Sequence, residues 1–294
     1  MTALVPAAEG AGATTTMGSV SIPGRAPSVS LRDARIRFGE RVLWDGLDLD
    51  VHPGEFVAVL GPNGSGKTTL LRVLLGLQPL DSGTVLVDGH PARRGSGRIG
   101  YIPQQQGMPE DLPLRAADLV GLGLDGHRFG PAFGLGLAGR RERRERVAAA
   151  LAAVGATSYA ASPVGRLSGG EQQRLRVAQA LVGDPAVLLC DEPLLSLDLA
   201  HQRTVTELVD ARRRSADTAV VFVTHEINPV LPLVDRVLYL VDGRFRIGAP
   251  EEVMTSETLS ELYRTDVEVL RTRGRLVVVG AEHAQDHHHH EAHA

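Results

Sequence analysis

The stretch Gly61-Pro62-Asn63-Gly64-Ser65-Gly66-Lys67-Thr68 decides the fold of this chain. It fits the pattern G-x-x-x-x-G-K-[ST], follows the apolar run 56–60, and precedes an apolar-periodic segment, 69–75, that Gly76 ends. Glycines let backbone N–H groups converge on phosphate oxygens, and the start of the following helix adds a partial positive charge. The sequence therefore predicts a buried strand, a phosphate-binding loop and a helix in that order.

Lys67 stands out because it is the single lysine among 31 basic side chains, which leaves 30 arginines. A compact ammonium on a flexible stem fits a crowded phosphate pocket better than a wide guanidinium does. We predict that Lys67 bridges the β- and γ-phosphates of a nucleotide and that the Thr68 hydroxyl ligates Mg²⁺. The alternative is a glycine-rich turn with a surface lysine. Base composition alone can explain the arginine bias, so this contrast is supporting evidence only.

The composition of the chain narrows its class. Its 294 residues carry 31 basic and 35 acidic side chains, and 43% are hydrophobic, which suffices for one large domain or two modest ones. The charge balance argues against a nucleic-acid binder that works through bulk positive potential. A single cysteine, Cys190, excludes an internal disulfide and suits a reducing cytosol. We find no apolar run of about 18 residues and no secretory signal, so we expect no membrane span.

The periodicity of the remaining sequence indicates an α/β fold. Alternation at 34–38 and 47–51 predicts half-buried strands, whereas the continuous apolar runs at 186–190 and 219–223 predict parallel strands buried on both faces. Further strands are predicted at 84–87, within 233–248 and within 267–280, and helices at 171–182 and 200–214. Residues 107–165 read as a mostly helical insertion, and we interpret the charged stretch 140–146 as a solvated helix face rather than an anion site.

Two carboxylates, Asp191 and Glu192, stand at the end of the predicted strand 186–190. A carboxylate in this place can hold Mg²⁺, and its neighbour can polarise an attacking water as a general base. An ordinary loop is the alternative for an apolar run that ends in Asp-Glu, but the phosphate-binding loop elsewhere favours the catalytic interpretation. We interpret Cys190 as a small buried core residue rather than a nucleophile.

A second anion-binding helix start is predicted at Leu167-Ser168-Gly169-Gly170-Glu171-Gln172. With this motif the chain resembles the ATP-binding cassette (ABC) family, whose signature reads LSGGQ or LSGGE. The resemblance covers about residues 29–250 and includes the family's motifs in order. It implies a P-loop NTPase core of the RecA-like type, with an antiparallel β subdomain and a helical insertion subdomain, and an ATPase that uses ATP and Mg²⁺.

The resemblance also assigns roles to single residues. It implies that Phe38 stacks on adenine (a core residue on a strand being the alternative), that Asp198 lies in a loop crossing a dimer interface, and that His225 contacts the γ-phosphate. Gln104 would reach Mg²⁺ and the lytic water, although Gln105 and Gln106 follow it, so this assignment rests on its closeness to Pro103. The implied nucleotide contacts are Phe38, Gly61, Pro62, Asn63, Gly64, Ser65, Gly66, Lys67, Thr68, Thr69, Ser168, Gly169, Gly170 and Asp198. The implied catalytic residues are Lys67, Gln104, Glu192 and His225, and the implied Mg²⁺ ligands are Thr68, Gln104 and Asp191.

Composition and periodicity, together with the same resemblance, predict a domain organisation, and the resemblance implies a set of partners. The expected units are a flexible extension at 1–28, an ATP-binding domain at 29–265 with its helical subdomain at about 107–165, a C-terminal strand region at 266–280, and a histidine-rich tail at 281–294. Met1 and Met17 are both candidate starts. Two copies of the chain would close head to tail around ATP, on the cytoplasmic face of the membrane. Their partners would be an integral membrane permease and, indirectly, an extracytoplasmic metal-binding protein, with no nucleic acid.

The prediction of the transported substrate rests on the segment after His225. The pairs Asn228-Pro229 and Leu231-Pro232, together with residues 259–279, resemble the ATPases of zinc and manganese importers. Importers of iron chelates and cobalamin are the alternatives, as is a regulatory or repair ATPase without a permease. Only 101 positions separate Lys67 from Ser168, which is typical of importers rather than of chromosome-associated relatives with a long coiled coil.

The tail holds six of the chain's eleven histidines, including His287, His288, His289 and His290. Imidazoles and carboxylates bind transition metals such as Zn²⁺, so the tail is a candidate metal-binding segment that buffers or senses metal. A purification tag is the alternative interpretation, but the interruptions by Ala, Gln, Asp and Glu favour a native sequence.

Overall fold

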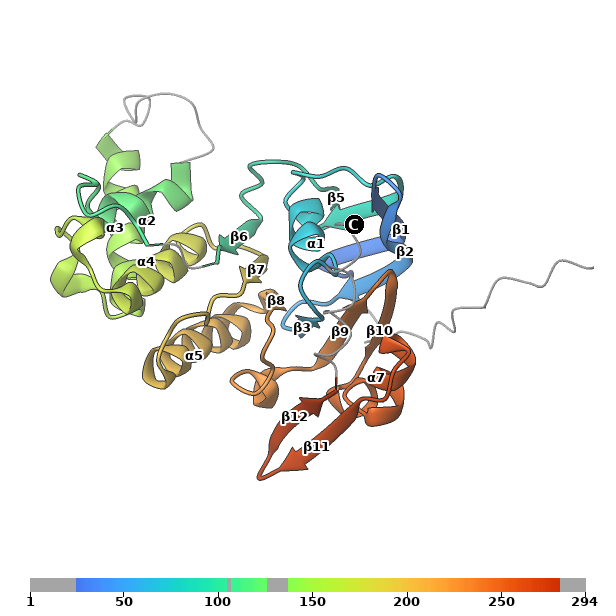
Figure 1. The fold of residues 1–294 in the computed structure, drawn as a ribbon. Coiled ribbons are helices and arrows are strands. Elements are labelled where there is room, and N and C mark those ends of the chain that lie inside the picture. The colour runs from blue at the N-terminus through green and yellow to red at the C-terminus, as the bar shows by residue number, and fades with distance from the viewer. Residues whose placement is uncertain (1–24, 105–106, 126–136, 281–294) are drawn as a thin grey trace, which may run out of the picture.

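The computed structural model describes residues 25–104, 107–125 and 137–280 of the chain. Within them, two sheets form the body of the molecule, and a helical part lies to one side (Figure 1). The predicted tail and residues 1–24 of the predicted extension lie outside the described residues. No helix in the described ranges has the length and apolar character needed to cross a membrane.

The larger sheet has six strands in the order β10-β9-β3-β8-β7-β6, parallel except for β10 at its edge. Its strands are β3 (Phe56–Leu60), β6 (Ile99–Ile102), β7 (Val187–Asp191), β8 (Ala219–Val223), β9 (Arg236–Val241) and β10 (Arg244–Gly248). Every residue of β3, β7 and β8 is buried, as their continuous apolar runs predict for strands covered on both faces.

The second sheet is antiparallel, with the order β2-β1-β4-β5. It consists of β1 (Val29–Phe38), β2 (Arg41–Val51), β4 (Ser82–Val87) and β5 (His90–Pro91). Two further strands, β11 (Glu268–Thr272) and β12 (Arg275–Val279), form a separate C-terminal hairpin. The α/β core with an antiparallel subdomain is therefore confirmed.

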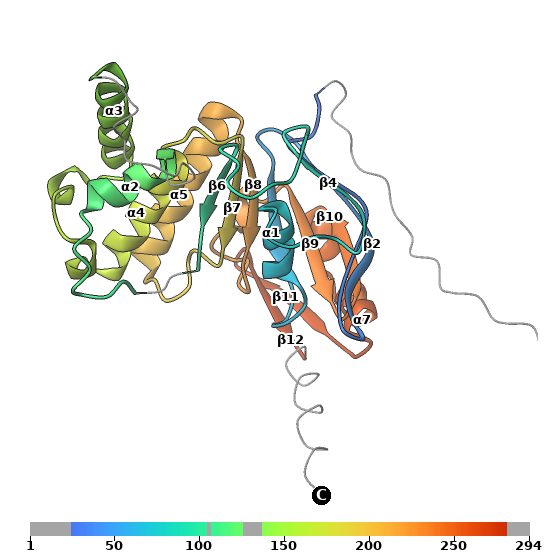
Figure 2. The same ribbon diagram turned by 90° about the horizontal axis from the view of Figure 1, so that it is seen from above.

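The helices divide between the core and the helical part. They are α1 (Lys67–Leu74), α2 (Ala116–Asp125), α3 (Leu137–Ala153), α4 (Gly169–Leu181), α5 (Leu199–Ala216), α6 (Pro250–Val253) and α7 (Ser256–Tyr263). Helix α1 lies between the two sheets and buries Leu70, Leu71 and Leu74 there (Figure 2). Because α1 packs against both sheets, the loop at its start is held on two sides.

Some elements escaped the sequence analysis. Strand β6 is only four residues long and includes Gly100 and Tyr101, so it lacks the apolar run that marks β7 and β8. Helices α6 and α7 are short, and their buried residues (Val253, Leu259 and Leu262) face a core shared with the C-terminal hairpin. Packing against distant parts of the chain therefore stabilises all three elements, and their local sequence does not show a long pattern that predicts them.

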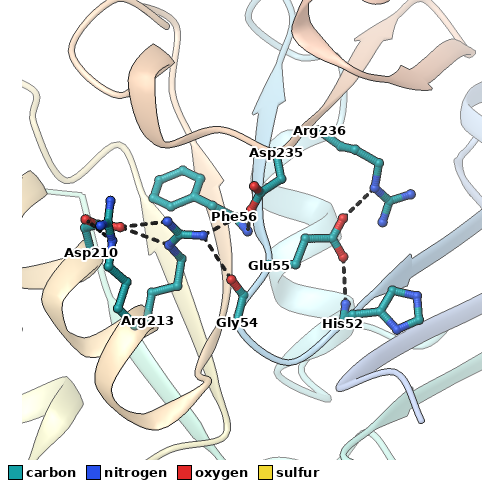
Figure 3. A network of polar contacts seen from close by, with 9 residues as sticks. His52, Gly54, Glu55, Phe56, Asp210, Arg213, Asp235 and Arg236 are labelled. Carbon is teal, nitrogen blue, oxygen red and sulfur yellow. Dashed lines mark hydrogen bonds and ion pairs between the residues drawn. The ribbon is translucent and has the colours of Figure 1, made fainter. Parts of the chain in front are cut away.

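A network of ion pairs fixes the amino-terminal ends of the central strands (Figure 3). Arg213 of α5 contacts Asp210 at 2.9 Å and Asp235 at 3.2 Å, and donates a 3.0 Å hydrogen bond to the Gly54 carbonyl. Asp235 in turn accepts a 2.8 Å hydrogen bond from the backbone N–H of Phe56, the first residue of β3. Arg213 thus joins α5 to the start of the strand that leads into the phosphate-binding loop.

Glu55 makes a parallel connection beside this network (Figure 3). Its carboxylate pairs with the Arg236 guanidinium and accepts a 2.7 Å hydrogen bond from the His52 backbone N–H. The end of β2 in the antiparallel sheet is therefore tied to the starts of β3 and β9 in the larger sheet, at the end of these two strands opposite to the phosphate-binding loop.

We expect the Arg213→Ala substitution to lower the free energy of unfolding by about 3 kcal/mol, because the side chain is only 14% exposed and its loss removes the ion pairs with Asp210 and Asp235 and the hydrogen bond to the Gly54 carbonyl. Arg203→Ala on the same helix is the matched control. Arg203 is 82% exposed in its pair with Glu207, so we expect a loss of less than about 1 kcal/mol. Urea unfolding of both variants measures the difference, and equal losses would contradict a stabilising role for the network.

Candidate active site

The loop between β3 and α1 adopts a backbone that only glycine tolerates at two of its positions. Gly61 has φ +141°, and a Cβ there would collide with the Leu240 carbonyl oxygen of β9. Gly66 has φ +102°, and a Cβ there would lie 2.9 Å from the indole nitrogen of the buried Trp44. These two glycines let the loop close tightly between the sheets and deliver Lys67 and Thr68 to the first turn of α1.

Lys67 folds back over this loop. Its Nζ donates hydrogen bonds to the carbonyls of Gly61 at 2.7 Å and Pro62 at 2.9 Å, and the residue is only 6% exposed. Burial lowers the pKa of Lys67, while the nearby carboxylates of Glu192 and Asp191 oppose that shift. The ammonium is thus held at the wall of a cavity of about 610 Å³.

This cavity unites most of the predicted site. It is lined by Leu43, Asn63, Gly64, Gly66, Lys67, Thr68, Thr69, Gln104, Glu192, Leu195 and His225. Three predicted catalytic residues that come from separate parts of the chain, namely Gln104, Glu192 and His225, therefore meet Lys67 here. Leu43 and Leu195 were not predicted, because a single leucine carries no chemical signal in a sequence.

Asp191 is the last residue of β7 and lies next to the phosphate-binding loop. Its carboxylate accepts a hydrogen bond from Tyr101 at 3.2 Å and another from Thr68 at 3.4 Å. Burial raises the pKa of Asp191, and burial beside this carboxylate raises the pKa of Tyr101 to about 12. The Thr68 hydroxyl and the Asp191 carboxylate are hard oxygen donors of the kind that suits Mg²⁺. Tyr101 was not among the predicted site residues, and sequence reasoning missed its hydrogen bond to Asp191.

Glu192 and His225 lie next to each other at the wall of the cavity. Glu192 has φ +46°, an unusual value for a residue with a side chain, and its side chain is 17% exposed. The Nδ1 atom of His225 lies 3.6 Å from the Glu192 Oε2 atom, and the His225 side chain is 54% exposed. The Glu192 backbone is strained, and its largely buried carboxylate lies next to an accessible imidazole. This arrangement fits a site that positions and activates water.

The second predicted anion site begins helix α4. Ser168 caps the helix by accepting a 3.3 Å hydrogen bond from the Glu171 N–H, and Glu171 accepts hydrogen bonds of 2.8 Å from the Ser168 N–H and hydroxyl. The hydrogen bond from the Ser168 N–H is the main cause that lowers the pKa of Glu171. The residues Ser168, Gly169 and Gly170 do not line the cavity that holds Lys67.

Phe38 and Asp198 also lie outside the residues that line this cavity. Phe38 ends β1 and is 50% exposed, which excludes the alternative of a core residue. Asp198 caps α5 and accepts hydrogen bonds from His201, at 2.9 Å from its N–H and 2.8 Å from its Nδ1. The roles predicted for both residues stay predictions.

His201 is a residue that the sequence analysis missed. Its ring contacts Asp198 and also lies where a Cβ on Gly170 would collide with it. It thus links the loop at 196–198 with the start of α4, and Gly170 has to be a glycine for this contact to exist. A single histidine near a helix start gives no signal of this in the sequence.

The fold and the loop at 61–68 define a P-loop NTPase. Comparison with known proteins agrees. The model of the ABC transporter family matches residues 44–195. The phosphonates import ATP-binding protein of Caulobacter vibrioides is 37% identical over 254 residues, which cover 82% of this chain and 95% of that protein. The hemin import ATP-binding protein of Streptomyces coelicolor is 37% identical over 268 residues, which cover 87% of this chain and 92% of that protein.

A solved structure shares the fold as well. A dimeric ATP-binding cassette in a post-hydrolysis state, bound to ADP and phosphate, superimposes with a TM-score of 0.62 at 29% identity and covers 75% of this chain and 98% of that chain. The chain therefore belongs to the ABC transporter family. It binds ATP and hydrolyses it, as the predicted enzyme class states.

Proposed function

We propose that this chain is the ATP-hydrolysing subunit of an importer for a divalent metal, zinc or manganese, and that it works with a separate membrane permease. The observation that carries the catalytic part is the single cavity that Lys67, Gln104, Glu192 and His225 share. Two relatives with 37% identity are named as import ATP-binding proteins, and this supports the direction of transport.

The residues of the cavity have distinct roles in this proposal. Lys67 neutralises the β- and γ-phosphate oxygens of ATP, to which the backbone N–H groups of the loop also donate hydrogen bonds. Thr68, Gln104 and Asp191 hold Mg²⁺, which supplies charge neutralisation at the phosphates when bound. Glu192 acts as the general base for the attacking water, and His225 donates a hydrogen bond to the γ-phosphate.

A second copy of the chain completes the site. Ser168, Gly169 and Gly170 begin a helix that stays outside the Lys67 cavity of their own chain, so in this proposal the start of the helix faces the ATP bound by a partner copy, with the N–H groups of Gly169 and Gly170 as donors. Phe38 stacks on adenine, and Asp198 lies at the dimer interface. The similar cassette bound to ADP and phosphate is dimeric, which supports this arrangement.

The choice of a divalent metal rests on the segment 225–234 and on the C-terminal strands. The pairs Asn228-Pro229 and Leu231-Pro232 are the residues on which we base the predicted resemblance to zinc and manganese importer ATPases. The dimer lies on the cytoplasmic face of the membrane, bound to its permease, and receives metal from an extracytoplasmic binding protein. The histidine-rich tail, with His287, His288, His289 and His290, lies outside the described residues. It binds arriving metal in this proposal.

A second candidate substrate is an iron chelate, since the hemin import relative aligns along 87% of this chain. Cobalamin import, or a regulatory or repair ATPase without a permease, would leave divalent-metal uptake independent of this chain.

Uptake measurements in a strain that lacks this chain distinguish these functions. We expect the parent chain to restore uptake of zinc or manganese, each tested separately, and the Glu192→Gln variant to restore neither. Deletion of residues 283–294 should change the metal concentration that gives half-maximal uptake. Restoration of hemin uptake with unchanged zinc and manganese uptake would transfer the assignment to the second candidate. If the chain restored the uptake of none of zinc, manganese and hemin, this result would contradict a role in importing them.

A further inference from the structure

The C-terminal hairpin is fastened to the segment that follows His225. The Asn228 side chain accepts a 2.8 Å hydrogen bond from the Leu276 N–H through Oδ1, and donates a 2.9 Å hydrogen bond to the Leu276 carbonyl through Nδ2. Both polar ends of one amide therefore pair with one residue of β12, in the manner of a neighbouring strand. The two residues are 48 positions apart, so the contact joins separate parts of the fold.

The backbone on both sides of His225 is held in place. On one side the Thr224 hydroxyl donates to the Glu226 carbonyl at 2.8 Å and accepts from the Glu226 N–H at 3.1 Å. On the other side Ile227 is buried in the main core, one position before Asn228. Because the exposed His225 ring extends from this short segment, its 3.6 Å approach to Glu192 depends on where the two anchors hold the backbone.

The hairpin can act as an anchor because it is itself firmly attached. Leu276 is buried in the same core as Ile227. Ser260 of α7 accepts a 2.9 Å hydrogen bond from the Val267 N–H and donates one of 3.1 Å to the Val267 carbonyl. Ser256 of the same helix accepts a 2.9 Å hydrogen bond from the N–H of Val269 in β11. Residues 256–279 thus form one connected unit behind the His225 segment.

A small second cavity continues this connection toward the catalytic carboxylate. It has a volume of about 80 Å³, and its lining includes Pro229, His225 and Glu192. The residue next to Asn228 therefore shares a cavity wall with the two proposed catalytic groups. A shift of the segment at Asn228 changes the shape of this wall.

We propose that Asn228 is a positioning residue through which the C-terminal hairpin holds His225 in register with Glu192. The proposal rests on the role proposed above for His225. It makes the hairpin part of the hydrolytic machinery, although it lies outside the matched family region 44–195. A partner that displaces the hairpin would consequently change the rate of ATP hydrolysis without touching the nucleotide.

The test separates the rate of hydrolysis from nucleotide affinity. With the full chain, we expect Asn228→Ala to lower kcat by about tenfold, because a small displacement of a catalytic group is costly, and to keep KM for ATP within about twofold. Hydrogen exchange of residues 224–230 should become faster. Asn228→Asp keeps the acceptor for the Leu276 N–H and loses the donor, so its kcat should lie between those of the parent and Asn228→Ala.

Two further variants serve as controls. Tyr263→Phe removes the 3.2 Å contact between the hydroxyls of Tyr263 and Tyr239, which joins the same C-terminal unit to β9 without involving the His225 segment. It should leave kcat unchanged. Equal losses of kcat in Tyr263→Phe and Asn228→Ala would show general loosening and overturn the proposal, as would a normal kcat in Asn228→Ala while His225→Ala is impaired. A normal kcat in His225→Ala would instead refute the role proposed for His225.

Discussion

The Lys67→Ala variant is expected to lose ATP hydrolysis by about 10³-fold, because a preorganised cation at the phosphates stabilises the charge of the transition state. In the structure the Lys67 ammonium is already held over the loop by the Gly61 and Pro62 carbonyls, at the wall of the 610 Å³ cavity. The chain has no other lysine that can take its place. Phosphate release measured at saturating ATP and Mg²⁺ gives the loss directly.

Two comparisons make this result specific. Lys67→Arg keeps the charge but brings a planar fork into a buried position that holds a compact ammonium, so it should remain at least about tenfold below the parent. Arg94→Ala removes an exposed cation outside the cavity and should behave as the parent. If Lys67→Ala retained a rate within about tenfold of the parent, the proposed role of the ammonium would be wrong.

The Glu192→Gln variant should separate ATP binding from ATP hydrolysis. Glutamine keeps the size of the side chain but cannot accept a proton, so we expect turnover to fall by about 10²- to 10⁴-fold. Affinity for ATP should stay within about twofold, since Lys67 and the loop at 61–68 are unchanged. Because the γ-phosphate then persists, the two copies should remain associated, and size-exclusion chromatography with ATP and Mg²⁺ should detect a stable dimer.

Glu207→Gln is the control for the loss of a carboxylate. Glu207 lies on the exposed surface of α5, where it pairs with Arg203, and its substitution should change neither turnover nor the oligomeric state. A Glu192→Gln protein that hydrolysed ATP at the parent rate would remove Glu192 from the role of general base. A monomer in the presence of ATP would instead contradict the shared interface.

Much of the fold was predictable because its decisive patterns are local. The apolar runs at 56–60, 186–190 and 219–223 became β3, β7 and β8 to within one residue, since strands buried on both faces need continuous apolar side chains. Strand β6 and helices α6 and α7 were not predicted. Each is short, and each depends on contacts with segments far along the chain. A local sequence pattern does not reveal such contacts.

The candidate site likewise contains residues that the sequence predicted and contacts that it did not predict. Lys67, Thr68, Asp191 and Glu192 could be selected from the sequence because each lies in the phosphate-binding loop, at the start of the helix after it or at the end of an apolar run, whereas His225 was selected through the resemblance to the ABC family. The contacts of Tyr101 with Asp191, of His201 with Asp198 and of Asn228 with Leu276 could not, because they join side chains from different elements. The residues that flank Tyr101, His201 and Asn228 in the sequence do not indicate that these side chains make such contacts.

The sequence by itself therefore determined the phosphate-binding loop, whose geometry follows from consecutive residues: glycines at φ values that other residues avoid, then a lysine at the start of a helix. The tertiary structure alone decided which distant groups meet around that loop. It set Glu192 against His225, tied the segment after His225 to the C-terminal hairpin, and kept Ser168 outside the cavity of its own chain. The physical reason is that backbone conformation is a local property, whereas the convergence of side chains depends on how the sheets and helices pack.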